Sequence, residues 1–171
     1  MITNEQLSKI SKVSITKINV YYPYLVKYMT EYKIDTKLRQ SAFIANLLVE
    51  SGRFIYVKEL ASGAAYEFRK DLGNTVKGYG IKYKGRGLIQ ITGRNNYQLL
   101  AKAFNIDFIK FPELLEQPDN AVRSACWFWN SKQLNILADK GDFKSVVKRI
   151  NGGLNGYTER LNYYNELMKI L

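Results

Sequence analysis

The stretch that decides the fold is YKGRGLIQITGRNNY, which spans residues 83–97 and places three glycines around a short apolar run. It continues a glycine-rich segment, because five glycines fall within residues 73–87. Glycine at this density favours turns, and the large side chains at alternate positions from 79 to 83 have the spacing of a short strand. We therefore predict a loop with a small β element here, followed by a helix over Arg94–Phe104.

Outward from this stretch, the chain shows helical patterns separated by proline and glycine. Thr3, with Gln6 three residues later, has the spacing of a capping box and predicts a short first helix. Gly52 predicts the end of a helix that begins at Asp35 or Thr36. The other predicted helices are Ser14–Tyr32, Asp119–Lys132, Asp142–Ile150 and Tyr157–Leu171.

Length and composition predict that residues 1–171 form a single domain. The helical pattern predicts that this domain is mainly α with a small β or loop element. A chain of this length that is 46% hydrophobic can bury about 70% of its unfolded surface, so it needs no disulfide or metal to fold. The chain has no histidine and one cysteine, which excludes His-dependent serine or cysteine nucleophiles, His-ligated zinc and an internal disulfide. Catalysis would rest on carboxylates, Lys, Tyr or hydroxyl groups.

The net charge is strongly positive, because 26 Lys and Arg residues face 15 Asp and Glu residues and leave +11. A basic protein is attracted to polyanions such as nucleic acid, anionic lipid and cell-wall polymers, and salt weakens that attraction. The charges are scattered among Gly and Tyr, which is more typical of a solvated surface than of a dedicated groove. The uncharged stretch Ile18–Val26 contains Pro23 and has the features of neither a signal peptide nor a membrane span.

Glu50 is the first candidate catalytic residue, because it lies at the end of the predicted third helix on the same face as Phe43 and Leu47. Apolar surroundings favour a protonated carboxyl group, which suits a general acid. The alternative is that the helix end frays and Glu50 points into water, where it pairs with Lys or Arg.

Glu59 lies nine residues further along the chain, where a short extended return would place it opposite Glu50. Two carboxyl groups facing each other across a cleft can hydrolyse a glycosidic bond, one as acid and the other as nucleophile or base. Glu67 is the second candidate for the partner carboxylate, although an ion pair with a nearby arginine is the more ordinary expectation for it.

Residues 83–97 closely resemble the signature of glycoside hydrolase family 19, Tyr-x-Gly-Arg-Gly-x-Ile-Gln-Leu-Thr-Gly-x-x-Asn-Tyr. The segments Glu59–Glu67 and Asp71–Thr75 look like the phage and prophage endolysin branch of that family. Trp127–Trp129 and Ile150–Gly153 match two further blocks in order. On these blocks the chain is identified as a member of the family and, within it, as similar to the endolysins.

This resemblance implies a lysozyme-like, mainly α-helical fold and assigns roles to particular residues. Glu50 falls at the position of the general acid, Glu59 at that of the general base, and Thr92 where a hydroxyl holds the attacking water. The expected substrate-binding residues are Tyr83, Gln90, Asn96, Asn151 and Arg160, the last of them near the catalytic acid. The resemblance implies no metal and no organic cofactor.

Three departures from the family pattern bear on the cleft. Val49 stands where many relatives have a histidine before the acid, and Phe68 stands where glycine is common. Residues 77–80 replace an acidic loop of the endolysin branch. Cys126 is expected to be a small buried hydrophobe, and the aromatic run Trp127–Trp129 is expected in the core before it is expected to stack on a ligand.

The expected function is hydrolysis of β-1,4 glycosidic bonds in bacterial peptidoglycan by a muramidase-type endolysin with an inverting, two-glutamate mechanism. Its expected partners are glycan strands and anionic envelope components, without nucleic acid or stable membrane insertion, and it is expected to be a monomer. Without a signal peptide, it would accumulate in the bacterial cytoplasm and reach the wall through a separate pore.

Three alternatives remain open. Chitin is the other substrate that the resemblance implies. A different phage lysozyme class would use Glu50 and Glu59 at the same spacing but has Thr where this chain has Ala65. A basic, non-enzymatic nucleic-acid-binding module would bind DNA in a salt-sensitive way without needing either glutamate.

Overall fold

The computed structural model describes residues 1–171 and consists mainly of helices. The α-helices are α1 (Asn4–Ser11), α2 (Ile15–Glu31), α3 (Lys37–Glu50), α4 (Tyr79–Lys82), α5 (Arg94–Phe104), α6 (Pro118–Ser131), α7 (Leu134–Asp139), α8 (Phe143–Asn151) and α9 (Tyr157–Ile170). Three short 3₁₀ helices, η1 (Ala64–Tyr66), η2 (Lys70–Leu72) and η3 (Pro112–Glu116), lie in the connections. The prediction of a mainly α, lysozyme-like domain is confirmed.

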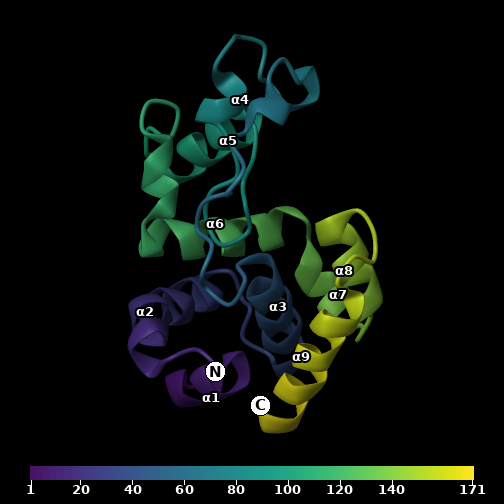
Figure 1. The fold of residues 1–171 in the computed structure, drawn as a ribbon. Helices are drawn as coiled ribbons and strands as arrows, with labels where there is room; N and C mark the ends of the chain where they lie inside the picture. The colour runs from purple at the N-terminus through teal and green to yellow at the C-terminus, as the bar shows by residue number, and fades with distance from the viewer.

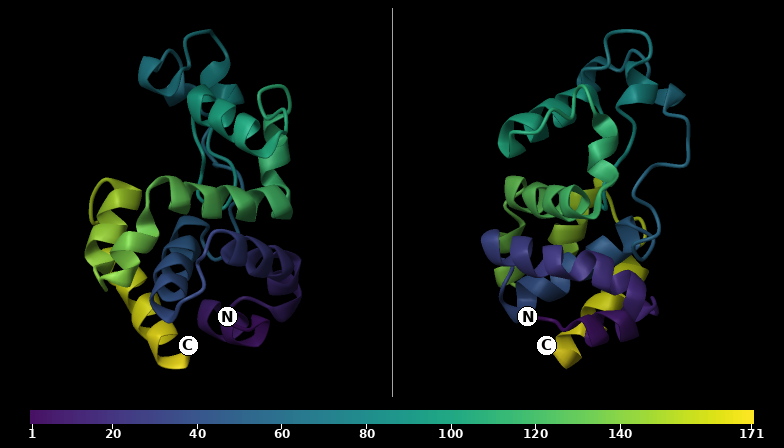
Figure 2. Two further views of the ribbon diagram at one scale, coloured as in Figure 1. Left: turned by 180° about the vertical axis from the view of Figure 1, so that it is seen from behind. Right: turned by 90° about the vertical axis from the view of Figure 1, so that its left-hand side faces the viewer.

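The molecule has two lobes, with α6 crossing between them (Figure 1). The large lobe contains α1–α3 and α6–α9, where α3 packs on α9 and α2 packs on α6. The small lobe, residues 59–116, carries α4 and α5 and projects from the helices of the large lobe (Figure 2). Each lobe has its own apolar core, of 28 buried residues in one case and seven in the other. Leu88 is fully buried in the core of the large lobe, so the loop that carries it joins the two lobes.

The helix starts agree with the capping residues that the sequence predicts. Thr3 and Gln6 form the complete capping box of α1, and Ser14 accepts a hydrogen bond from the third backbone N–H of α2. Thr36, rather than Asp35, caps α3 through its hydroxyl. Because α3 carries Glu50 at its other end, this cap helps to determine where the glutamate lies.

The predicted short strand around residues 79–83 is wrong, because α4 occupies that place. Tyr79 and Tyr83 are one helical turn apart, and their rings pack edge to face with centroids 5.3 Å apart. The carboxylate of Glu67 accepts hydrogen bonds from the backbone N–H groups of Gly78 and Ile81, at 3.0 and 3.3 Å, and so holds the first turn. Local alternation had the right spacing for a strand, but no partner strand lies beside it.

The β structure is instead reduced to two isolated antiparallel bridges, Lys58 with Arg86 and Arg86 with Ile91. The second bridge folds residues 86–91 back on themselves, and the first ties this turn to Lys58. Helix α7 was not predicted, since it has six residues and follows Gln133 at a φ of +53°. None of the helices combines the length and apolar character needed to cross a bilayer.

Candidate active site

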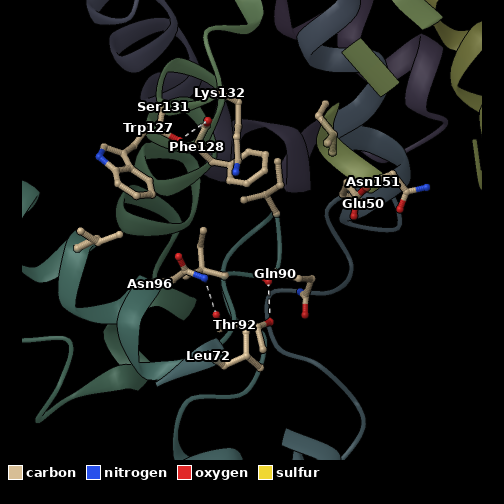
Figure 3. Close-up of a pocket in the computed structure, with 14 residues that line it drawn as sticks. Glu50, Leu72, Gln90, Thr92, Asn96, Trp127, Phe128, Ser131, Lys132 and Asn151 are labelled. Atoms are coloured by element: carbon tan, nitrogen blue, oxygen red, sulfur yellow. Dashed lines mark hydrogen bonds between the residues drawn. The ribbon is translucent and has the colours of Figure 1, made fainter. Parts of the chain in front are cut away.

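A cleft of about 540 Å³ lies between the two lobes. Five of the eight residues that the sequence singled out line it, namely Glu50, Gln90, Thr92, Asn96 and Asn151. In Figure 3, Glu50 and Asn151 lie on one wall, Thr92 and Asn96 lie on the other, and α6 closes the end between them. The other three, Glu59, Tyr83 and Arg160, do not line this space.

Glu50 is fixed by an arginine from the other end of the chain. Its Oε1 accepts a hydrogen bond of 2.6 Å from Nη2 of Arg160 on α9, and the glutamate side chain is 21% exposed. Nη1 of the same arginine donates to Oδ1 of Asn46 at 2.9 Å, one turn before Glu50 on α3. The helix end is therefore not frayed, whereas the pairing with an arginine that this alternative included is present.

Arg160 lies beside Glu50, as the family resemblance implied, but it was also expected among the substrate-binding residues. The residue is 4% exposed, and both of its terminal nitrogens are engaged by α3. A guanidinium in that position has no free face for a sugar. Arg160 is a positioning residue for Glu50.

On the opposite wall, side chains form hydrogen bonds to backbone carbonyls of residues a few positions earlier in the chain. The hydroxyl of Thr92 donates to the carbonyl of Gln90 at 2.9 Å, and the amide of Asn96 donates to the carbonyl of Thr92 at 2.8 Å. Gln90 has a φ of +55°, an uncommon conformation for a residue with a side chain, which clusters at functional sites. The Thr92 oxygen keeps lone pairs that can accept a hydrogen bond from water.

Glu59 is not among the residues that line the cleft and is held by two donors. Its Oε2 accepts from the backbone N–H of Gly85 at 3.1 Å, and its Oε1 accepts from the hydroxyl of Tyr66 at 2.9 Å. Burial, and then the hydrogen bond to Glu59, raise the pKa of Tyr66. The hydroxyl therefore stays protonated and acts as the hydrogen-bond donor.

Gly85 shows how close Glu59 comes to the cleft. A Cβ on this glycine would lie 2.7 Å from Oε1 of Gln90 and 3.2 Å from Oε2 of Glu59. Both side chains, Gln90 of the cleft wall and Glu59, therefore reach the same small space beside Gly85. A side chain at position 85 would separate them.

Glu67, the second candidate for the partner carboxylate, belongs to the loop that starts α4. It accepts from two backbone N–H groups and forms no ion pair with an arginine, so neither of the roles considered for it describes its place. Its oxygens hold the loop rather than face the cleft.

Tyr83 is not placed to bind a sugar, because only 1% of it is exposed. Its ring packs between Tyr79 and Tyr97, and its hydroxyl donates to the carbonyl of Ile109 at 3.2 Å. Burial raises the pKa of Tyr97 to about 12, and its hydroxyl donates to the carbonyl of Lys84. The tyrosines of residues 83–97 thus form the core of the small lobe.

Helix α6 and the residue that follows it supply cleft residues that the sequence did not predict, namely Trp127, Phe128, Ser131 and Lys132. The buried stripe of this helix is Val122, Ala125, Cys126 and Trp129. Their spacing of three, four and seven residues is that of one helix face, and it leaves Trp127 and Phe128 off that face. This periodicity could have separated the core tryptophan from the cleft tryptophan.

Cys126 is fully buried as expected, and burial raises the pKa of its thiol well above the usual value.

Known proteins are similar to this chain in sequence and in fold. The family model described as "Chitinase class I" matches residues 45–148. A protein of Haemophilus influenzae that carries a glycosyl hydrolase family 19 domain is 33% identical over 163 residues, which cover 77% of this chain and 80% of that protein. An endochitinase of Arabidopsis thaliana is 33% identical over 138 residues, which cover 77% of this chain and 47% of the endochitinase. The chain thus spans about half the length of that plant enzyme.

Among solved structures, chitinase C from Streptomyces griseus HUT6037 superposes with a TM-score of 0.77 at 24% identity, covering 99% of this chain and 76% of the chitinase. A class IV chitinase from Zea mays gives a TM-score of 0.77 at 21% identity, covering 98% of this chain and 91% of that one. Both share the fold described above. Because the family model spans more than half of the chain and the bacterial relative matches over most of its own length, the protein belongs to glycoside hydrolase family 19 and is a glycoside hydrolase.

Proposed function

We propose that this glycoside hydrolase cuts β-1,4 bonds in bacterial peptidoglycan as a muramidase-type endolysin. The observation that carries the hydrolytic part is the position of Glu50, fixed by Arg160 on one wall of the cleft, opposite Thr92 and Asn96 on the other. The peptidoglycan part is supported by the net charge of +11, because the wall and its envelope are anionic and chitin is neutral. It is also supported by the resemblance of residues 59–75 to endolysins.

In the proposed mechanism, Glu50 donates its proton to the glycosidic oxygen as the bond from that oxygen to the anomeric carbon breaks. A water molecule attacks the same carbon from the opposite face while Glu59 takes one of the protons of that water. Thr92 accepts a hydrogen bond from that water, and Gln90, Asn96 and Asn151 contact hydroxyl and N-acetyl groups of the substrate. The product is inverted at the anomeric carbon, which requires the two carboxyl groups to be roughly 6.5 to 9.5 Å apart in the complex with substrate.

Digestion of purified peptidoglycan followed by mass spectrometry tests this proposal. Fragments with reducing-end muramic acid are expected. Reducing-end glucosamine, anhydro sugars or cleaved peptides would each identify a different activity, and a trapped covalent sugar adduct would contradict the inverting mechanism.

Chitin hydrolysis is the second candidate, and the observation that favours it is the naming of the plant relatives as endochitinases and of the structural neighbours as chitinases. Turnover of neutral chitooligosaccharides, compared with that of peptidoglycan strands at equal concentration of scissile bonds, separates the two. Membership of a hydrolase family argues against the non-enzymatic nucleic-acid-binding module.

The cellular setting is part of the same proposal. The enzyme would act as a monomer of phage or prophage origin that is made in the host cytoplasm and released to the wall through a separate pore-forming protein. Fractionation of expressing cells with and without such a pore-forming protein, followed by assay of both fractions, tests this setting.

A further inference from the structure

The cleft contains one cationic side chain, Lys132, that the hydrolytic mechanism does not use. Lys132 follows the last residue of α6 and is exposed. Its Nζ lies 5.6 Å from the centre of the Phe128 ring, and both residues line the cleft. Figure 3 shows the side chain running alongside Phe128 toward the space between the walls.

A second cation, Arg149 on α8, lies beside it. Nη1 of Arg149 donates to the backbone carbonyl of Lys132 at 3.3 Å, which brings α8 against the end of α6. The two residues that follow, Ile150 and Asn151, line the cleft. Lys132 therefore gives the cleft a cationic end, and Arg149, which does not itself line the cleft, lies against the backbone of Lys132 just outside it.

No carboxylate of the protein neutralises this cationic end. Neither residue takes part in any of the six ion pairs of the chain. Glu50 is the one acidic residue among those that line the cleft, and it is paired with Arg160. One unpaired cation in the cleft with a second one beside it attracts an anionic ligand more strongly than the rest of the wall does.

We propose that Lys132 and Arg149 bind a carboxylate of the substrate and so favour peptidoglycan over neutral polysaccharides. This inference rests on the proposed function, because chitin carries no carboxylate whereas peptidoglycan does. The carboxylate has two sources, the lactyl group of muramic acid where the peptide has been removed and the stem peptide where it is present. In both cases the recognition is an ion pair at the edge of the site, away from the reacting bond.

The experiment compares the variants Lys132→Met and Arg149→Met with the wild type on four soluble substrates. These are glycan strands with intact stem peptides, strands stripped by an amidase, strands whose carboxylates have been converted to neutral amides, and a chitooligosaccharide. The measured quantity is kcat/KM on each strand divided by kcat/KM on the chitooligosaccharide. We expect this ratio to fall about three- to fivefold in each variant on carboxylate-bearing strands, the size of an exposed ion pair, mainly through KM.

Matched variants separate local recognition from global charge. Lys169→Met removes the same charge from the exposed last turn of α9 and should leave the ratio at the wild-type value. Lys132→Arg keeps the positive charge, so its ratio should stay close to the wild-type value. On the amidated strands the ratio should be the same in Lys132→Met and wild type.

A loss confined to stripped strands assigns the lactyl carboxylate, and a loss on intact strands assigns the stem peptide; both support the proposal. An unchanged ratio in Lys132→Met, or an equal fall in Lys169→Met, overturns it while the proposed function stands. A wild-type enzyme that cuts the chitooligosaccharide but no peptidoglycan strand overturns the proposed function, and this inference with it.

Discussion

At the scale of single residues, the two glutamates are held in different ways. Glu50 meets the nearly buried guanidinium of Arg160, while Glu59 accepts from a backbone N–H and from the hydroxyl of Tyr66. Donors on both oxygens fix the orientation of Glu59, whereas only Oε1 of Glu50 is bonded to Arg160 and Glu50 lines the cleft. The structure thus gives different surroundings to the two residues that the family resemblance names as acid and base.

Replacing either glutamate by glutamine tests these assignments. Glu50→Gln and Glu59→Gln should each reduce kcat by about 10²- to 10⁴-fold, because each removes a proton-transfer step. Hydrolysis of peptidoglycan strands and thermal unfolding measure activity and folding on the same samples.

The control for this pair is Glu67→Gln, which changes a carboxylate of the loop before α4 and should lower activity far less. Full activity in Glu59→Gln would remove this residue as the base, and a large drop in the unfolding temperature of any variant would disqualify its kinetic result.

Gly85 gives a second prediction at this scale. Gly85→Ala should lower kcat at least tenfold, because its Cβ would lie within 2.7 Å of Gln90 and 3.2 Å of Glu59 and would push the two side chains apart. Gly153→Ala is the control, since no atom lies within 4 Å of the added group. Wild-type kinetics in Gly85→Ala would show that the spacing between Gln90 and Glu59 does not matter for the reaction.

At the scale of elements, α3 connects stability to the site, because Thr36 caps its start and Glu50 ends it. Its neighbour α9 supplies Arg160, and α5 follows the wall that carries Thr92. Three helices distant in sequence therefore orient one cleft. A helix that loses its cap frays, and the effect is measurable as a lower free energy of unfolding.

Thr36→Ala should lower the free energy of unfolding by about 1 kcal/mol, since it removes the side-chain acceptor for the N–H of Arg39. For a chain of this size, that corresponds to a fall of about 2–4 °C in Tm. Thr158→Ala, at an exposed position inside α9, is the control for loss of a threonine. Equal Tm values for Thr36→Ala and wild type would mean that packing alone sets the start of α3.

At the scale of the whole molecule, the +11 charge acts over distances longer than any contact in the cleft. Lys144 and Lys148 are exposed on α8, whose other face buries Phe143, Val146 and Val147 in the large lobe. The helix is thus an amphipathic helix packed on the core. Its lysines contribute to attraction without touching the cleft.

Lysis of outer-membrane-permeabilised cells should fall steeply as salt rises, whereas cleavage of a small neutral oligosaccharide should change little. Salt shortens the screening length from about 8 Å at physiological ionic strength to about 3 Å at 1 M and so weakens long-range attraction rather than proton transfer inside the cleft. Turbidity of cells and reducing-end release from the oligosaccharide provide the two readouts.

The double variant Lys144→Gln and Lys148→Gln should reduce the activity on cells more than the activity on the oligosaccharide. Equal losses on both substrates would indicate a folding defect, and parallel salt curves for the two substrates would contradict a role for the net charge.

Local sequence determined most of the helices and where they begin. Capping side chains such as Thr3, Ser14 and Thr36 act within one turn, so their effect can be read without knowing the rest of the fold. The motif of residues 83–97 likewise indicated the family, and it placed Gln90, Thr92 and Asn96 together because they are close along the chain. The lack of histidine had already restricted catalysis to carboxylates, Lys, Tyr or hydroxyl groups.

Only the tertiary structure decided which of these side chains face the cleft. Tyr83 belongs to the family motif but is buried, because its direction depends on packing with Tyr79 and Tyr97. Arg160 reaches Glu50 across 110 positions of the chain. Lys132 enters the cleft only because α6 crosses between the lobes. Spacing along the chain predicts contacts within one element, whereas contacts between elements depend on how buried surfaces pack, and that information is spread over the whole sequence.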